Sequence, residues 1–117
     1  MFKQIYQPLI LPHFKKNSKW YRKKYRHLQE SLIEILEKFE KSQHVHLGNN
    51  IYKIRFKTSD IAKGKSKSFR LIVLVMEVEK FLVPMVLYFK GDRENITKKE
   101  LNDHLETILL EMRYQEN

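Results

Sequence analysis

The sequence predicts an α+β fold: an N-terminal helical hairpin packed on a small, mainly antiparallel β-sheet, with a C-terminal helix. Three observations support this prediction. The 117 residues fit a single domain spanning residues 1–117. Apolar residues recur at helical spacing through residues 13–43, whereas residues 51–90 hold the alternating and continuous apolar runs of strands. Because runs of helix and strand follow one another along the chain, we expect helices on one sheet.

The first 43 residues predict a short strand and a bent helical segment. Residues 4–11 end in three apolar side chains before Pro12, which is typical of a short strand. From Phe14 onward apolar side chains follow helical spacing, and no Gly or Pro interrupts residues 13–43. A straight helix of this length would far exceed the radius of gyration of about 13 Å expected for such a domain. We therefore expect two helices hinged near residues 23–27.

Three strands are expected next. Residues 47–50 give a turn signal, and the strand at residues 51–57 alternates between two faces. One face carries Tyr52, Ile54 and Phe56, and the other carries Lys53, Arg55 and Lys57.

A polar loop at residues 58–68 leads to a second strand at residues 69–76. This strand is apolar on both faces except at Arg70, so we expect it in the centre of the sheet. The third strand covers residues 81–90, where Pro84 favours a late start or an edge position.

The last helix begins with a recognisable cap. Thr97 and Glu100 have the spacing of a capping box, in which each side chain accepts a hydrogen bond from the other residue's backbone N–H. The apolar stripe that follows consists of Leu101, Leu105, Ile108, Leu109 and Met112.

Charge is distributed in blocks. The net charge is +9, and residues 1–29 carry eight cations without an acid. Residues 41–70 carry another eight cations against Asp60 alone, while residues 30–40 and 91–117 are acidic. Segregation of this kind favours an anionic partner on a defined surface. The alternative is that the charge serves solubility.

Composition excludes several classes of protein. Without cysteine there is no disulfide framework, thiolate zinc site or cysteine nucleophile. The richest apolar region, residues 69–89, is interrupted by Glu77, Glu79 and Lys80, so it does not predict a membrane span. With no signal peptide apparent, we expect a cytoplasmic protein with no membrane partner.

The candidate site lies on the basic face of the predicted sheet. Lys53, Arg55 and Lys57 repel one another and contribute nothing to packing, and Arg70 would extend their face on the next strand. Arg70 enters a strongly apolar strand with no acid nearby, so it requires an anionic partner. Clustered cations also lower the pKa of any lysine among them and favour bound phosphate. The alternative is a solvated sheet face, on which such residues are common.

Three segments resemble a known family. They are Ile51–Arg55 (IYKIR), residues 64–72 (GKSKSFRLI) and Tyr88–Lys90 (YFK). Their order and spacing are similar to those of the RelE/ParE superfamily of bacterial toxins, in particular to RelE/HigB-like members. Lys67 and Ser68 stand where that family's loop has two glycines.

The resemblance implies a RelE-like toxin of a type II toxin–antitoxin system. Such toxins cleave mRNA, usually on translating ribosomes, and are neutralised by a cognate antitoxin protein. They use neither a metal nor another cofactor. The RNA 2′-hydroxyl attacks the adjacent phosphate, a step that needs a base, an acid for the 5′-oxygen and cations around the phosphorane.

Family roles can be carried onto matching positions, although the general base stays unassigned. Arg55 and Arg70 would stabilise the transition-state charge, and Lys53 would hold the phosphate or transfer a proton. Tyr88 would stack on a base or act as an acid beside Lys90. The remaining RNA- or phosphate-binding candidates are Lys57, Lys65 and Lys67.

Three alternatives remain at this point. A ParE-like protein would inhibit DNA gyrase with the same fold, although such proteins typically lack the basic set. A non-catalytic RNA-binding module would use the same basic face without cleaving RNA. An adaptor would bind an acidic protein through its basic helices.

The histidines carry weaker signals. His44 and His46 share one side of an extended segment, but no third ligand is evident, so we expect no metal site. His13 and His27 should lie on solvated helix faces. His104 should be a partly exposed surface residue, and it is the best histidine candidate for a catalytic role.

Overall fold

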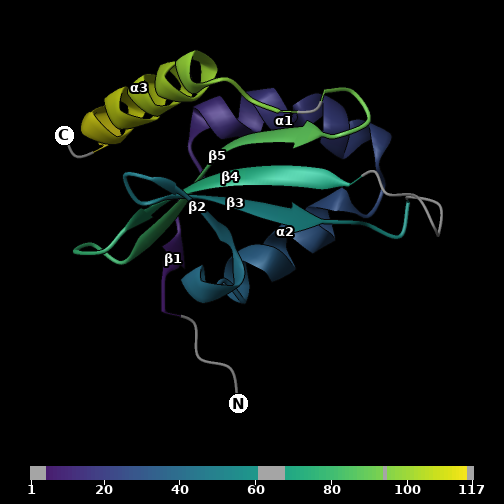
Figure 1. Cartoon of the computed structure of the whole chain (residues 1–117), viewed down its shortest axis with the longest axis horizontal. Helices are drawn as coiled ribbons and strands as arrows, with labels where there is room; N and C mark the ends of the chain where they lie inside the picture. Colours follow the sequence, from purple (N-terminus) through teal and green to yellow (C-terminus); the bar gives the residue numbers. More distant parts are fainter. Residues whose placement is uncertain (1–4, 61–67, 94, 116–117) are drawn as a thin grey trace.

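The computed structural model describes residues 5–60, 68–93 and 95–115 (Figure 1). The elements are β1 (Gln7–Pro8), α1 (Pro12–Lys24), α2 (Leu28–Glu37), a 3₁₀ turn (Lys41–Gln43), β2 (Val45–Gly48), β3 (Ile51–Phe56), β4 (Phe69–Met76), β5 (Phe81–Phe89) and α3 (Lys98–Gln115). One five-stranded sheet has the order β1-β5-β4-β3-β2. Among the described strands only β1 pairs in parallel, so the predicted α+β fold with a mainly antiparallel sheet is confirmed.

The helical hairpin bends where the sequence predicted. α1 starts at Pro12, whose missing N–H is harmless in the first turn, and it ends at Lys24. α2 starts after His27, whose backbone N–H donates to the Asp60 carboxylate at 2.9 Å. Asp60 therefore supplies the cap that the helix sequence itself lacks. The expected helical run to residue 43 was too long, since α2 ends at Glu37 and only a 3₁₀ turn follows.

Apolar side chains form a core on each face of the sheet. On one face, Phe14 of α1 and Leu32 of α2 pack against Ile54, Leu71 and other buried strand residues. The opposite core includes Ile72 and Leu74 of β4, together with Ile108 and Met112 of α3. β4 is therefore buried on both faces, as its continuous apolar sequence predicted.

Two strands differ from the prediction. β2 (Val45–Gly48) was missed, because four residues give little periodicity and a turn was expected from residue 47. The turn instead begins at the last residue of β2, and Gly48, Asn49 and Asn50 all have positive φ angles. The first strand is only β1 (Gln7–Pro8), which pairs with the start of β5.

Pro84 neither delays β5 nor places it at the sheet edge. β5 starts at Phe81 and lies between β1 and β4. Ile72 of β4 pairs with Val86 and the next residue, Val73, pairs with Pro84, so Met85 is the extra residue of a bulge in β5 beside Pro84. β1 ends before this point, so the missing N–H of Pro84 interrupts no bond to β1.

The capping box of α3 is confirmed: the Glu100 N–H donates to the Thr97 hydroxyl at 3.1 Å, and the Thr97 N–H donates to Glu100 at 3.2 Å. Leu109 departs from the expected apolar stripe and is 48% exposed. Within the described ranges, no helix has the length and apolar character needed to span a bilayer.

Candidate active site

Pairing across three strands brings the central site residues together. Arg70 of β4 lies opposite Arg55 of β3 and Tyr88 of β5, so all three project from the same face of the sheet. Lys53 lies two residues from Arg55 and shares that face. These four predicted residues therefore converge, although they are separated by up to 35 positions in the sequence.

A hollow of about 190 Å³ lies over this part of the sheet. We call it the basic hollow; its lining residues are Lys53, Arg55, Arg70, Lys90 and Asn95. In the part of the chain that the structure describes, none of its four cations pairs with a carboxylate. Such a concentration of unmatched positive charge favours a bound anion, and Arg and Lys are the residues that bind phosphate best.

Arg70 is the most buried cation of the basic hollow, with only 4% of its surface exposed. Its Nη1 donates to the Ser68 hydroxyl and, at 3.3 Å, to the Phe69 carbonyl. These contacts fix one side of the guanidinium and leave other N–H donors for a ligand. Burial, followed by the nearby Arg55, lowers the pKa of Arg70.

The surroundings of Lys53 in the basic hollow perturb its pKa. Partial burial lowers the pKa of Lys53, and the neighbouring Arg55, Arg70 and Lys90 lower it further. This result agrees with the sequence argument that clustered cations disfavour a charged lysine. A lysine with a lowered pKa can give up a proton more readily than a solvated one.

Tyr88 contributes a buried phenol. Only 4% of Tyr88 is exposed, and its hydroxyl has no hydrogen-bond partner among the described residues. Burial raises the pKa of Tyr88 despite the opposing effect of Arg70. Tyr88 and Lys53 also line a second hollow of about 250 Å³, whose walls include Leu47, Ile96 and Leu101.

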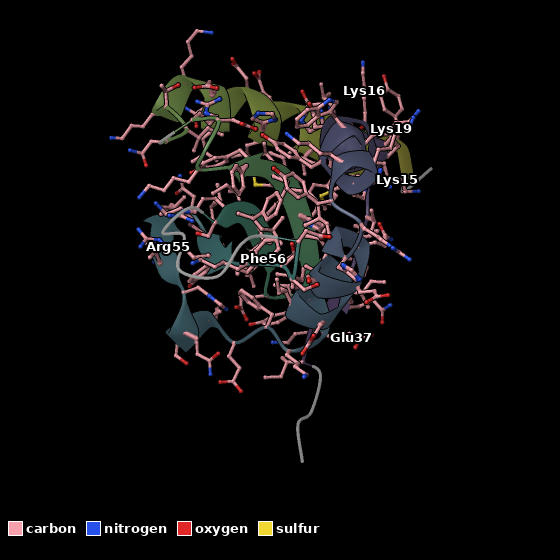
Figure 2. The ribbon with its side chains drawn as sticks, turned by 90° about the vertical axis from the view of Figure 1, so that its right-hand side faces the viewer. Lys15, Lys16, Lys19, Glu37, Arg55 and Phe56 are labelled. Carbon is pink, nitrogen blue, oxygen red and sulfur yellow. The ribbon has the colours of Figure 1, made fainter. Side chains whose placement is uncertain are left out.

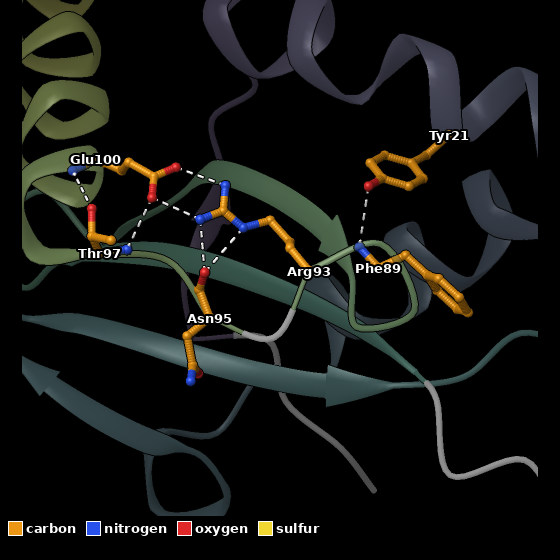
Figure 3. A network of polar contacts seen from close by, with 6 residues as sticks. All are labelled: Tyr21, Phe89, Arg93, Asn95, Thr97 and Glu100. Atoms are coloured by element: carbon orange, nitrogen blue, oxygen red, sulfur yellow. Dashed lines mark hydrogen bonds and ion pairs between the residues drawn. The ribbon is translucent and has the colours of Figure 1, made fainter.

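The loop from β5 to α3 is held by an ion pair that the sequence analysis missed (Figure 3). Arg93 donates to both Glu100 carboxylate oxygens at 2.6 and 2.7 Å, and to the Asn95 carbonyl at 3.0 and 2.7 Å. The hydrogen bonds that Glu100 accepts, chiefly those from Arg93, lower the pKa of the Glu100 carboxyl to about 2. The contacts fix the backbone of Asn95, whose side chain points away from Arg93 and lines the basic hollow.

The remaining predicted residues differ in their positions relative to the basic hollow. Lys90 follows the end of β5 and lines the basic hollow. Lys57 lies just beyond β3, is exposed and does not line it. Lys65 and Lys67 fall outside the described residues. Asn95 was overlooked because a loop residue gives no periodic signal that would place it beside the strands.

Three histidines are held in local contacts. His44 stacks on Phe39 with ring centroids 5.4 Å apart, and His46 stacks on Tyr52 at 4.6 Å. In the described ranges, no three metal-binding side chains come together. Asp60 accepts a 3.1 Å bond from the exposed His27 ring.

The prediction for His13 was wrong, because this half-buried side chain is not on a solvated face. Its Nε2 lies 2.7 Å from Nδ1 of His104, so the pair joins α1 to α3. His104 is half-buried, in agreement with its expected partial exposure. Burial lowers the pKa of both histidines, and each therefore favours the neutral form.

Comparison with known proteins agrees with the sequence resemblance. Residues 13–115 match the family described as "RelE toxin of RelE / RelB toxin-antitoxin system". No curated protein matches the chain in sequence. Among solved structures, a mutant of the E. coli toxin RelE in the free state is similar at 19% identity and a TM-score of 0.47, covering 77% of this chain and 88% of that one. From the family match over most of its length, the chain belongs to the RelE family of toxins of toxin–antitoxin systems.

Proposed function

We propose that this toxin is an endoribonuclease that cleaves mRNA, with the basic hollow as its active site and translating ribosomes as the place of cleavage. The observation that carries the proposal is the set of four cations around one hollow, unmatched by any described carboxylate. A group that binds there must supply negative charge, and a phosphodiester does so. Family membership supports the same activity and supplies the cognate antitoxin as the protein partner.

The proposed reaction forms a bond from the RNA 2′-oxygen to phosphorus and breaks the bond from phosphorus to the 5′-oxygen. A dianionic phosphorane forms between these steps, and Arg70 and Arg55 would stabilise its developing charge. Arg70 suits this role because its contacts to Ser68 and Phe69 orient it before substrate arrives. The products are a 2′,3′-cyclic phosphate and a free 5′-hydroxyl.

Two protons must move during this reaction. The 2′-hydroxyl loses one as it attacks, and the departing 5′-oxygen gains one. Lys53 is the proposed proton donor to the 5′-oxygen, because its lowered pKa favours release of a proton. Lys90 would hold the phosphate, and Tyr88 would contact a base from the adjoining hollow.

Induced expression of the Arg70→Ala variant tests the proposal. We expect wild-type induction to arrest growth and to produce new mRNA 5′ ends in frame with codons, as mapped by primer extension. The variant should abolish both effects. Lys19→Ala, which removes an exposed cation from α1, should retain both.

Three outcomes would contradict the proposal. A fully toxic Arg70→Ala variant would exclude Arg70 from catalysis, provided that circular dichroism shows both chains folded. Growth arrest with intact mRNA and altered DNA supercoiling would replace the nuclease by a gyrase inhibitor. RNA binding without cleavage products, even with ribosomes present, would instead indicate a non-catalytic binding module.

A further inference from the structure

The end of β5 is held from two sides, by the sheet on one and by a helix on the other. β1 pairs only with the first two residues of β5, so the far end of β5 has no described strand on that side. There the Phe89 N–H donates to the Tyr21 hydroxyl of α1 at 3.3 Å (Figure 3). The next N–H, that of Lys90, donates to the Ser68 carbonyl just before β4 at 2.9 Å. Tyr21 therefore satisfies a backbone donor that a neighbouring strand would otherwise bind.

The Tyr21 hydroxyl both accepts and donates a hydrogen bond. Besides accepting from Phe89, it donates to the Asp92 carboxylate at 3.0 Å. Asp92 lies in the turn that follows β5, and its own N–H donates to the Phe89 carbonyl at 2.9 Å. The Tyr21 ring is half-buried and meets the Phe69 ring edge to face, with centroids 5.8 Å apart. Packing of the ring thus directs one hydroxyl to the end of β5 and to the turn after it.

These contacts lie one residue away from the basic hollow. Lys90 lines the hollow and directly follows Phe89, whose N–H binds Tyr21. Ser68 accepts from the Lys90 N–H through its carbonyl and from Arg70 through its hydroxyl. Two cations of the hollow are therefore tied to the segment that Tyr21 holds. Tyr21 itself does not line the hollow, so any effect that it has there passes through these neighbours.

The turn after β5 extends this influence to Asn95. The Arg93 N–H donates to the Phe89 carbonyl at 3.2 Å, and the Arg93 side chain holds the Asn95 carbonyl at 2.7 and 3.0 Å. Because Asp92 directly precedes Arg93, its bond to Tyr21 anchors this turn on α1. With the two cations described above, three of the five residues that line the basic hollow depend on the anchored segment.

We propose that Tyr21 is a positioning residue of the basic hollow. Its hydroxyl fixes the end of β5, so that Lys90 and Arg70 face the same phosphate in the geometry of the transition state. Tyr21 touches neither the substrate nor the reacting atoms. The inference rests on the proposed nuclease activity, because it assigns Tyr21 a role in the rate of that reaction.

Removal of the hydroxyl alone tests this role. In single-turnover cleavage of mRNA on ribosomes, Tyr21→Phe should reduce the rate about tenfold, because the reaction depends on the alignment of the cations. Its affinity for a 2′-O-methyl RNA, which cannot be cleaved, should stay within about twofold of wild type, since every cation of the hollow remains. A lower rate at unchanged affinity is the signature of an interaction that matters only in the transition state.

Two control variants separate positioning from a general loss of stability. Tyr25 lies one turn after Tyr21 and packs on the same Phe69 ring at 5.0 Å, but its hydroxyl has no hydrogen-bond partner among the described residues. Tyr25→Phe should therefore keep the wild-type rate. Tyr6 donates to the Glu77 carboxylate at 2.7 Å, beside the start of β5 and far along the strand from Lys90. Tyr6→Phe should destabilise the chain through the lost bond, as Tyr21→Phe does, yet leave the rate within about twofold of wild type.

A double-mutant cycle and hydrogen exchange locate the contact. Asp92→Ala removes one partner of Tyr21 and should slow cleavage about threefold. Asp92→Ala combined with Tyr21→Phe should be no slower than Tyr21→Phe alone, because both substitutions remove the same contact. By NMR, the Phe89 amide should exchange with solvent at least about threefold faster in Tyr21→Phe, whereas Tyr6→Phe should leave its exchange unchanged, because the end of β5 opens locally.

Three results would overturn the inference. An unchanged cleavage rate in Tyr21→Phe would exclude the role, and equal losses of rate in Tyr21→Phe and Tyr6→Phe would indicate an effect of stability alone. Losses of rate and RNA affinity in the same proportion would assign Tyr21 to RNA binding. A wild-type chain that leaves mRNA intact would instead contradict the proposed function, on which the inference rests.

Discussion

α1 and the basic hollow are both rich in cations, but they hold their charges in different ways. The lysines of α1 are exposed, and Figure 2 shows Lys15, Lys16 and Lys19 extending from the helix surface. The cations of the basic hollow come from three segments and face one another around a single hollow. Convergence, rather than the number of charges, therefore distinguishes a candidate catalytic site from a charged surface.

The convergence depends on the rigidity of β4. Arg70 is followed by five buried apolar residues, and it is held between β3 and β5 by pairing on both sides. The cations of the basic hollow repel one another and so oppose folding, and the apolar packing of β4 must offset this repulsion. A phosphate in the basic hollow would remove that repulsion, and the folded chain should therefore bind it well.

The largest expected effect is on the rate of mRNA cleavage. Loss of a cation from the basic hollow should slow cleavage far more than loss of a cation from α1. In single-turnover cleavage of mRNA on ribosomes, Arg70→Ala should reduce the rate about 100-fold to 1000-fold, as expected for loss of one preorganised donor. Arg55→Ala should reduce it about tenfold, because Arg55 is exposed and its charge is screened by solvent. Lys19→Ala should change the rate by less than about threefold.

An equal loss of rate in Arg70→Ala and Lys19→Ala would contradict this distinction. It would indicate that cleavage responds to total charge alone. Measurement at two salt concentrations separates the cases, since a steering charge loses its effect at high salt and a buried one does not.

The sequence predicted the centre of this site because the signals there are local and periodic. Alternation in residues 51–57 placed Lys53 and Arg55 on one face, and the apolar run around Arg70 placed the next strand beside them. Antiparallel pairing then aligned Arg55, Arg70 and Tyr88. The family resemblance named the same residues.

The parts that sequence reasoning missed depend on contacts between distant residues. The Arg93–Glu100 pair and the placement of Asn95 arise only when the loop closes over the sheet. The His13–His104 contact joins residues that are 91 positions apart in the sequence. The concave surface between α1 and α2, which Ile10, Ile33 and Leu36 line, was missed as well, because periodicity shows that the helices are amphipathic without showing how closely they pack.

The Tyr88→Phe variant tests whether the site holds a buried polar group that lacks a hydrogen bond. The Tyr88 hydroxyl is buried without a described partner, so its removal should raise the free energy of unfolding by about 1 kcal/mol, measured in urea. Tyr21→Phe is the matched control. Its hydroxyl donates to Asp92 at 3.0 Å and accepts from the Phe89 N–H at 3.3 Å, as Figure 3 shows for Phe89, so its loss should destabilise the chain by a similar amount. A destabilised Tyr88→Phe would show that the hydroxyl already has a partner.

The pH dependence of RNA affinity should distinguish Lys53 from an exposed lysine. Because its pKa is lowered, Lys53 loses its charge below the ordinary lysine value of 10.5 as pH rises. Affinity for a 2′-O-methyl RNA, which cannot be cleaved, should then fall about threefold to tenfold toward alkaline pH in the wild type. Lys53→Arg should keep its affinity over the same range, because arginine stays protonated.

The stability of the chain should also depend on pH through Lys53. Between the lowered pKa and 10.5, the unfolded chain binds more protons at Lys53 than the folded chain does. The free energy of unfolding should therefore rise with pH in this window, and Lys53→Arg should remove the rise. Identical alkaline profiles for the two proteins would show that Lys53 titrates as a solvated lysine.

The smallest expected effect concerns Lys41, a cation of the second basic block that takes no part in the basic hollow. Its Nζ contacts the Glu77 carboxylate at 2.7 Å, so Lys41→Ala should leave RNA affinity within about twofold of wild type. A weaker RNA affinity in this variant would extend the functional surface beyond the four cations of the basic hollow.

The Glu77 carboxylate should make stability depend on pH. Lys41 and the Tyr6 hydroxyl, which also lies 2.7 Å from Glu77, lower the pKa of Glu77 to about 2 from 4.5. The stabilisation by the carboxylate is therefore present above pH 4.5 and is lost as pH falls toward 2. Since the Glu77 side chain is 37% exposed, Glu77→Gln should lower the free energy of unfolding at neutral pH by less than about 1 kcal/mol. In thermal unfolding, the stability of Glu77→Gln should therefore fall less steeply between neutral pH and pH 2 than the stability of the wild type does. Equal declines in the two proteins would contradict the lowered pKa of Glu77.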